Sequence, residues 1–239
     1  DMMKNYDTDS ALNNDFDIKQ FQEIGKLVCK LNDSKFVDRV MKVCKTLFYV
    51  RKFEERLDQS TKVLCFENGV FDFDTCSFRN GTPDDCCSLT TGYSYPKEYN
   101  MKKKKIELIY QFFNKVQPNK IMSEYVLTLL STYLCGENPE QQFIIWTGEG
   151  GAGKSQTIEL FLNSLGEYGK VMPITLLTRE QKGAGSATPE LAEIKGRRAC
   201  IFNEPESGDR IYTSILKTLS GSDVIKARPL YKELIQFRS

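Results

Sequence analysis

The sequence predicts an α/β protein in which helices cover both faces of a parallel sheet, preceded by a smaller mixed α+β domain. Apolar, β-favouring runs at 143–147, 170–172 and 199–202 alternate with helical patterns in the second half of the chain. We therefore expect an accessory α+β domain over residues 1–117 and a P-loop α/β domain over residues 118–239.

The accessory region is expected to begin with helices over residues 17–31 and 34–48, where apolar residues recur three or four positions apart. The pattern then changes to short β-favouring runs at 63–66 and 70–73. Asn68-Gly69 separates these runs and indicates a tight hairpin turn.

A four-lysine run, Lys102 to Lys105, is expected to be the solvated start of a helix that ends before Pro118. A nucleic-acid contact is the alternative for this run. A second helix should follow and end at Gly136.

Composition excludes several classes of function. The chain is 40% hydrophobic and 27% charged, with a net charge of +1, and no apolar run approaches the roughly 20 residues of a membrane-spanning helix. The chain has eight cysteines without a C-x-x-C pair, and it has no histidine. We therefore expect no zinc site, no membrane partner and an intracellular, reducing location. Any nucleic-acid contact should be local, because the surface is not uniformly basic.

Residues Gly148 to Ser155 fit the phosphate-binding pattern G-x-x-x-x-G-K-[ST] between a strand-like run and a helical pattern. Glycines let backbone N–H groups turn toward a phosphate, and the helix points its positive end at the same place. Lys154 is the catalytic cation, and the Ser155 hydroxyl is expected to hold Mg²⁺. The predicted ATP-binding residues are Gly148, Glu149, Gly150, Gly151, Ala152, Gly153, Lys154, Ser155 and Gln156.

The acidic partner of this loop is expected at the end of the run 199–202, where ligands collect in open α/β sheets. Glu204 is assigned to Mg²⁺ and to activation of water. Glu206 is a weaker second carboxylate for the metal, since Pro205 separates the two acids. The alternative is a buried strand that ends in a solvated acidic turn.

Three segments, 146–155, 199–206 and 215–231, occur in the order typical of a superfamily 3 helicase domain. The upstream segments 66–72 and 82–85 resemble the domain that precedes it. Together they resemble the primase-helicases of poxviruses and other large DNA viruses, which are related to phage and plasmid primase C-terminal regions. The resemblance covers about residues 20 to 237.

This resemblance implies an AAA+-like ATPase that assembles as a homo-hexameric ring and moves along single-stranded DNA at a replication fork, using ATP and Mg²⁺. It implies a location in the host cytoplasm or a virus factory. Lys226, Arg228 and Lys232 would lie on a β-hairpin that contacts DNA phosphates; ordinary solubilising charges are the alternative. Tyr231 is expected to pack under this hairpin rather than to stack on a base.

The family's polar sensor residue and arginine finger are expected beyond residue 239, so this chain should bind ATP far better than it hydrolyses it. No primase acidic motif is evident in residues 1–100. Two other functions remain open from the residues alone. One is a P-loop kinase acting on a small molecule, and the other is a nucleotide-regulated DNA-binding or packaging protein without unwinding activity.

Overall fold

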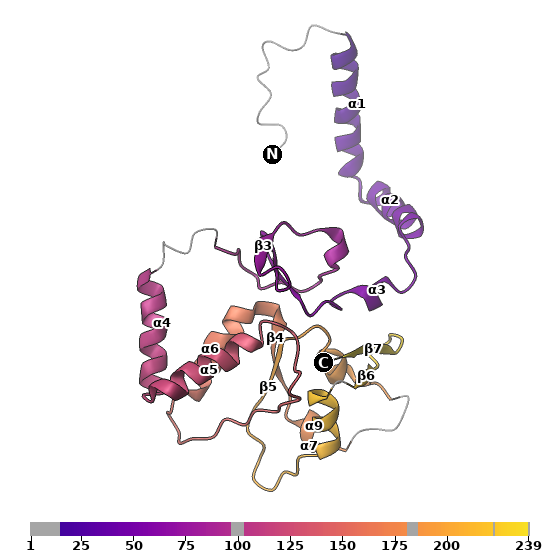
Figure 1. Ribbon diagram of the computed structural model, residues 1–239. Helices are drawn as coiled ribbons and strands as arrows, with labels where there is room; N and C mark the ends of the chain where they lie inside the picture. The colour runs from indigo at the N-terminus through magenta and orange to yellow at the C-terminus, as the bar shows by residue number, and fades with distance from the viewer. Residues whose placement is uncertain (1–14, 97–102, 181–185, 222, 239) are drawn as a thin grey trace. The chain divides into compact units, whose positions relative to one another are not determined.

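The computed structural model describes residues 15–96, 103–180, 186–221 and 223–238, and Figure 1 shows the course of the chain. The chain divides into two compact units, residues 1–53 and 54–239. The predicted division into domains at residue 118 stays a prediction.

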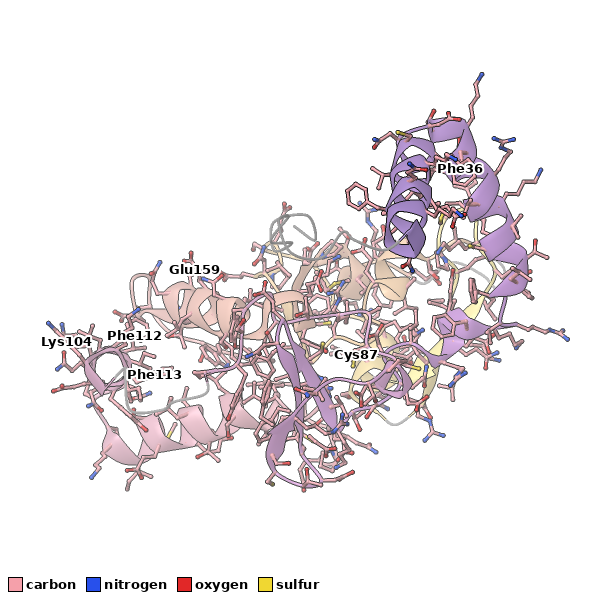
Figure 2. All side chains as sticks on the ribbon, turned by 90° about the horizontal axis from the view of Figure 1, so that it is seen from above. Phe36, Cys87, Lys104, Phe112, Phe113 and Glu159 are labelled. Carbon is pink, nitrogen blue, oxygen red and sulfur yellow. The ribbon has the colours of Figure 1, made fainter. Side chains whose placement is uncertain are left out.

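The first unit contains α1 (Asp15–Leu31) and α2 (Ser34–Leu47), which pack against each other. Asp33 is the N-cap of α2, and its carboxylate accepts a hydrogen bond from the backbone N–H of Lys35 at 3.0 Å. Lys30 lies 6.0 Å from the ring of Phe36 (Figure 2). The two helices expected from apolar periodicity are confirmed. The short helix α3 (Phe53–Arg56) follows them at the boundary between the units.

The second unit begins with an antiparallel meander of β1 (Val63–Phe66), β2 (Gly69–Asp72) and β3 (Ser77–Arg79). The hairpin expected here is confirmed, but its two-residue connection is Glu67-Asn68, because Phe66 pairs with Gly69 and Gly69 is the first residue of β2. The Asn68 side chain fixes this turn, because it accepts from the N–H of Tyr95 at 2.8 Å and donates to its carbonyl at 3.0 Å.

The 3₁₀ turn η1 (Pro83–Asp85) is held to the end of the meander by a half-buried carboxylate. Asp85 accepts from both Nη atoms of Arg79, at 3.0 and 2.7 Å, and from the Thr82 N–H at 2.7 Å. This hydrogen bonding, led by Arg79, lowers the pKa of Asp85 to about 2.

Two helices connect the meander to the glycine-rich loop 148–153. In α4 (Lys103–Val116), the rings of Phe112 and Phe113 meet edge to face, 5.5 Å apart (Figure 2), and Phe113 is buried. Asn119 caps α5 (Lys120–Thr132) by accepting from two backbone N–H groups. Lys104 and Lys105 lie on exposed turns of α4, as expected, whereas Lys102 lies outside the described residues.

The α/β region contains α6 (Lys154–Leu165), η3 (Gly166–Tyr168), β4 (Gly169–Met172), α7 (Thr175–Thr178), α8 (Pro189–Ala192) and β5 (Ala199–Phe202). Strands β4 and β5 pair in parallel, with Met172 opposite Phe202 at their carboxyl ends. The mixed α/β class and the parallel pairing are therefore confirmed.

The predicted strand at 143–147 is wrong as a strand, because these residues join no ladder in the described part of the chain. Ile144 and Trp146 are half-buried, while Phe143 and Ile145 are exposed, so the segment keeps the alternation of an extended chain. A strand also needs a hydrogen-bonded neighbour for its backbone groups, and the sheet of β4 and β5 contains only those two strands among the described residues.

The last elements are α9 (Thr213–Ser220), β6 (Val224–Ala227) and β7 (Ile235–Arg238), the two strands forming an antiparallel pair. Their inner residues join a core whose buried members are Met172, Leu177, Leu191, Ile194, Ile215, Ile225, Ala227 and Phe237. A separate core joins the meander to α4, α5, α6 and η3, and its buried members are Leu64, Phe66, Phe113, Leu130, Phe161, Leu165, Tyr168 and Ala199.

Candidate functional site

Three residues of the loop from Gly148 to Gly153 have a backbone conformation that only glycine adopts readily. Gly151 and Gly153 have φ values of +80° and +82°, in the left-handed region, and Gly148 has φ +153°. A Cβ atom at Gly153 would also lie 2.7 Å from a methyl group of Val116 at the end of α4. The local conformation therefore requires glycine at positions 148, 151 and 153, whereas Gly150 has open space and no positive φ.

Lys154 is the first residue of α6, and its ammonium group bends back over the loop. Its Nζ atom donates to the carbonyl oxygens of Gly148 at 2.6 Å and Glu149 at 3.1 Å. Ser155 and Gln156 in the next positions are exposed. The first turn of an α-helix leaves backbone N–H groups without helical partners, so a cation, N–H groups and a hydroxyl gather at one helix end.

The direction of the chain relates this helix end to the parallel strands. Helix α6 packs on β4 and leads into it through η3, and Gly169 lies so close to α6 that a Cβ atom would be 2.7 Å from Leu162. A helix that packs on a strand after such a short turn runs antiparallel to it. Lys154 therefore lies toward the carboxyl end of β4, the end where β5 finishes at Phe202.

Glu204 follows β5 by two residues and is exposed. Glu206 begins a turn in which its N–H donates to the Asp209 carboxylate at 3.2 Å, and the Asp209 N–H donates back to the Glu206 carbonyl at 3.0 Å. The backbone of Glu206 thus belongs to a separate local turn, whereas Glu204 follows directly after the strand and Asn203.

A hydroxyl and a carboxylate are oxygen donors of the kind that Mg²⁺ prefers, and Mg²⁺ usually takes its other ligands from phosphates and water. Ser155 and Glu204 suit such a shared ion. Within the described ranges, no group of three or more acidic, cysteine or histidine side chains is arranged to hold a metal by itself.

The hairpin predicted around Pro229 is confirmed as the β6–β7 pair. Lys226 is exposed opposite Gln236. Arg228 is exposed just past β6, and its backbone N–H donates to the Thr188 hydroxyl at 2.9 Å. Lys232 forms an exposed ion pair with Glu54 at 3.5 Å.

Tyr231 lies in the connection between β6 and β7. The expectation that it packs under the hairpin is wrong, because Tyr231 is fully exposed with φ +60°. The connection turns sharply at this residue, which directs the ring away from the core beneath the strands.

A half-buried arginine that the sequence analysis did not identify joins the meander to the α/β region. Arg198 donates to the carbonyls of Val63 at 2.7 Å, Ser60 at 3.3 Å and Thr61, and its guanidinium lies 5.4 Å from the Tyr168 ring. The Tyr168 hydroxyl in turn accepts from the Cys65 N–H at 3.1 Å. The one feature of the sequence that could have indicated this role is the position of Arg198 directly before the strand β5.

Comparison with known proteins adds to this geometry. Residues 9–118 match the family described as D5 N terminal like. The chain is 45% identical over 215 residues to "Putative helicase L207/L206" of Acanthamoeba polyphaga mimivirus. This alignment covers 90% of this chain and 22% of that protein. It is 28% identical over 215 residues to "Putative helicase 121R" of Invertebrate iridescent virus 3, covering 90% of this chain and 23% of that protein.

The chain is also 24% identical over 212 residues to "Putative primase C962R" of African swine fever virus, covering 87% of this chain and 22% of that protein. The chain thus spans about a fifth of the length of the curated relatives that it matches. Among the described residues, no helix has the length and apolar character needed to cross a membrane.

Proposed function

The chain is related to the D5-like viral primase-helicases, as its motifs predicted, and we propose that it carries the nucleotide site of an ATP-dependent DNA helicase motor in viral replication. The observation that carries this proposal is the glycine loop at the start of α6, with Lys154 folded onto its carbonyls. Relatives named as helicases and a primase support a role in replication.

The residues of this chain suggest a division of labour at the triphosphate. The loop N–H groups and the start of α6 would bind the phosphates, and Lys154 would move from the loop carbonyls to the β- and γ-phosphates. Ser155 and Glu204 would hold Mg²⁺, which supplies neutralising charge at the phosphates when bound. Glu204 would also orient the attacking water, because no histidine is present to act as a base.

Charge and conformation also favour the β6–β7 hairpin as a DNA contact. Lys226 and Arg228 are exposed cations on or beside a narrow two-stranded element, and Tyr231 offers an exposed ring to a base. Assembly as a homo-hexamer around one DNA strand would bring six copies of this hairpin to the same strand. The hexameric ring and its binding to a single DNA strand are both part of this proposal.

The experiment that tests the function uses a protein that contains this chain within the longer sequence typical of its relatives. ATP hydrolysis, its stimulation by single-stranded DNA and ATP-driven strand separation should all be present, and Lys154→Ala should abolish strand separation. Lys120→Ala, which removes an exposed lysine at the start of α5, is the matched control and should change none of them.

The outcomes separate the other functions considered. Phosphate transfer to a small molecule rather than to water would indicate a kinase. Nucleotide and DNA binding without strand separation would indicate a nucleotide-regulated DNA-binding protein. A lack of DNA-stimulated ATP hydrolysis in the longer protein would contradict the helicase proposal.

A further inference from the structure

A cavity lies at the amino end of β5, the opposite end of that strand from Glu204. Its volume is about 330 Å³, near the lower end of the range for small-ligand pockets. One wall is the turn Lys195–Arg198, another is the segment 58–61, and the third is formed by Val224 and residues 236–238 of the β6–β7 hairpin.

The Lys195–Arg198 turn places three cations within four residues. Gly196 makes the turn with φ +74°, and a Cβ atom there would lie 2.8 Å from Asp58, so the backbone approaches the facing wall closely. Lys195, Arg197 and Arg198 are all half-buried around the cavity. Burial strengthens the field of such charges, because less water screens them.

These cations donate to backbone carbonyls rather than to carboxylates. Lys195 Nζ lies 2.6 Å from the Glu54 carbonyl, Arg197 donates to the Glu193 and Glu167 carbonyls, and Arg198 donates to the segment 60–63. No ion pair recorded between described residues contains any of the three cations. Carbonyl oxygens orient the cations without cancelling their charge.

Asp58 is the carboxylate in the cavity wall, and it is already engaged. It accepts from the Ser88 N–H at 2.7 Å, from the Ser88 hydroxyl and from the Leu89 N–H at 3.3 Å. Its negative charge is thus directed toward the 88–89 loop. The cavity as a whole keeps a positive charge of at least two, which favours an anionic ligand.

The outer face of the β6–β7 hairpin leads into this cavity. Val224 pairs with Arg238 and Lys226 pairs with Gln236, and all four side chains are exposed on the face opposite the buried Ile225, Ala227 and Phe237. Arg238 therefore lies at the cavity and Lys226 lies two residues farther along the same face, about 7 Å away along the strand. A chain of phosphates following this face would reach the cavity.

We propose that this cavity, lined by Lys195, Arg197, Arg198 and Arg238, binds a backbone phosphate of a single-stranded nucleic acid that runs along the outer face of the β6–β7 hairpin. The inference rests on the proposed function in taking a nucleic acid as the partner. It adds a contact outside the hairpin residues Lys226, Arg228 and Lys232. A strand held at both places would be positioned without reading its sequence.

The test measures binding of a fluorescent oligo(dT) 20-mer to the chain by anisotropy at several salt concentrations. Arg238→Gln is the first variant, because Arg238 is exposed and no recorded hydrogen bond or ion pair of a described residue includes its side chain. It should weaken binding roughly three- to tenfold and reduce the slope of log affinity against log salt by about 0.7, the value for one phosphate contact on a single strand. Arg51→Gln, an exposed arginine of the first unit, is the matched control and should change neither quantity.

Arg197→Gln in the same assay should reproduce the loss, and a thermal melt shows whether that variant remains folded. Equal effects of Arg238→Gln and Arg51→Gln would overturn the proposal, because they would indicate general attraction to positive charge. Sodium tripolyphosphate, tested in the Lys154→Ala background, distinguishes a free polyphosphate as the ligand. If Arg238→Gln weakens its binding but leaves oligo(dT) binding intact, the nucleic-acid proposal is overturned.

Failure of this proposal is distinguishable from failure of the proposed function, since the binding assay needs no ATP hydrolysis. Loss of oligo(dT) affinity in Lys226→Gln with none in Arg238→Gln would leave the hairpin as the DNA contact and exclude the cavity. The reverse result would support the cavity even in a protein that unwinds nothing.

Discussion

Alanine substitutions at three loop glycines, made one at a time, test whether each glycine of the proposed phosphate loop is needed for its backbone conformation or only completes the sequence motif. Gly150 has open space around it and an ordinary φ, so Gly150→Ala should be nearly neutral. Gly151 also has open space but has φ +80°, a conformation that costs a residue with a Cβ atom about 1–2 kcal/mol. Gly153 combines φ +82° with a Cβ position 2.7 Å from the stiff, branched side chain of Val116.

Because the loop is exposed and makes few buried contacts, these costs should appear in the affinity for ATP more than in global stability. Gly150→Ala should change the dissociation constant by less than about twofold, and Gly151→Ala should raise it roughly 5- to 30-fold. Overpacking typically adds a further 1–3 kcal/mol, so Gly153→Ala should exceed about 30-fold.

The assay is titration with a fluorescent ATP analogue, with a melting curve for each variant to show that it is folded. The ranking of the three variants is the informative result, since all three remove a glycine from the same motif. Equal losses in all three, or an unchanged affinity in Gly153→Ala, would refute the argument from the loop conformation.

Three further predictions concern stability and reactivity. Arg198→Ala leaves the carbonyls of the 60–63 segment without their donor and should lower the free energy of unfolding by about 3 kcal/mol. This loss corresponds to a melting temperature about 6–12 °C lower in a domain of this size. An unchanged melting temperature would contradict the stabilising role of these hydrogen bonds. Burial raises the pKa of Cys87 to about 12, so at pH 8 its thiolate fraction is roughly a thousandfold below that of an ordinary exposed thiol. Iodoacetamide should therefore label the exposed Cys76 long before Cys87 in the native protein, and mass spectrometry of the peptides would show the order of labelling. Arg79 lowers the pKa of Asp85 to about 2, so the stability from this carboxylate is present above its unfolded pKa of about 4 and is lost as the pH falls toward 2. In Arg79→Gln, the urea concentration at the midpoint of unfolding should therefore depend less on pH across that window. An equally steep loss of stability in acid in the variant would exclude this pair as its source.

Local patterns predicted the elements whose causes are local. The β1–β2 hairpin, the helix after Gly153 and the strand 199–202 each depend on residues within a few positions, and each is present, although the hairpin turns one residue earlier than Asn68-Gly69, at Glu67-Asn68. The candidate loop was likewise predicted from the spacing of its residues alone, because glycine can itself adopt the backbone conformation that such a turn needs.

Features that depend on distant segments were not predictable from the sequence. The partners of Arg198 lie about 135 positions earlier in the chain, and no pattern near Arg198 indicates them. The run 143–147 has the composition of a strand, but the ladder depends on a neighbour that composition cannot specify. The exposed ring of Tyr231 depends in the same way on the path of the whole hairpin connection.

The cavity at the amino end of β5 illustrates the same limit. Its cations are adjacent in the sequence, as Lys195, Arg197 and Arg198, and read as an ordinary basic turn. Their significance arises from the facing walls, 58–61 and 236–238, and from hydrogen bonds to carbonyls in place of carboxylates.

The most direct test of the central claim is the position of Glu204 in a structure of the protein bound to Mg²⁺ and a non-hydrolysable ATP analogue. The account predicts that the ion touches the Ser155 hydroxyl at about 2.1 Å and that a Glu204 oxygen lies either at the same distance or about 4 Å away through one water. A Glu204 carboxylate more than roughly 8 Å from that ion would contradict the account, because neither metal binding nor orientation of the attacking water could then fall to it.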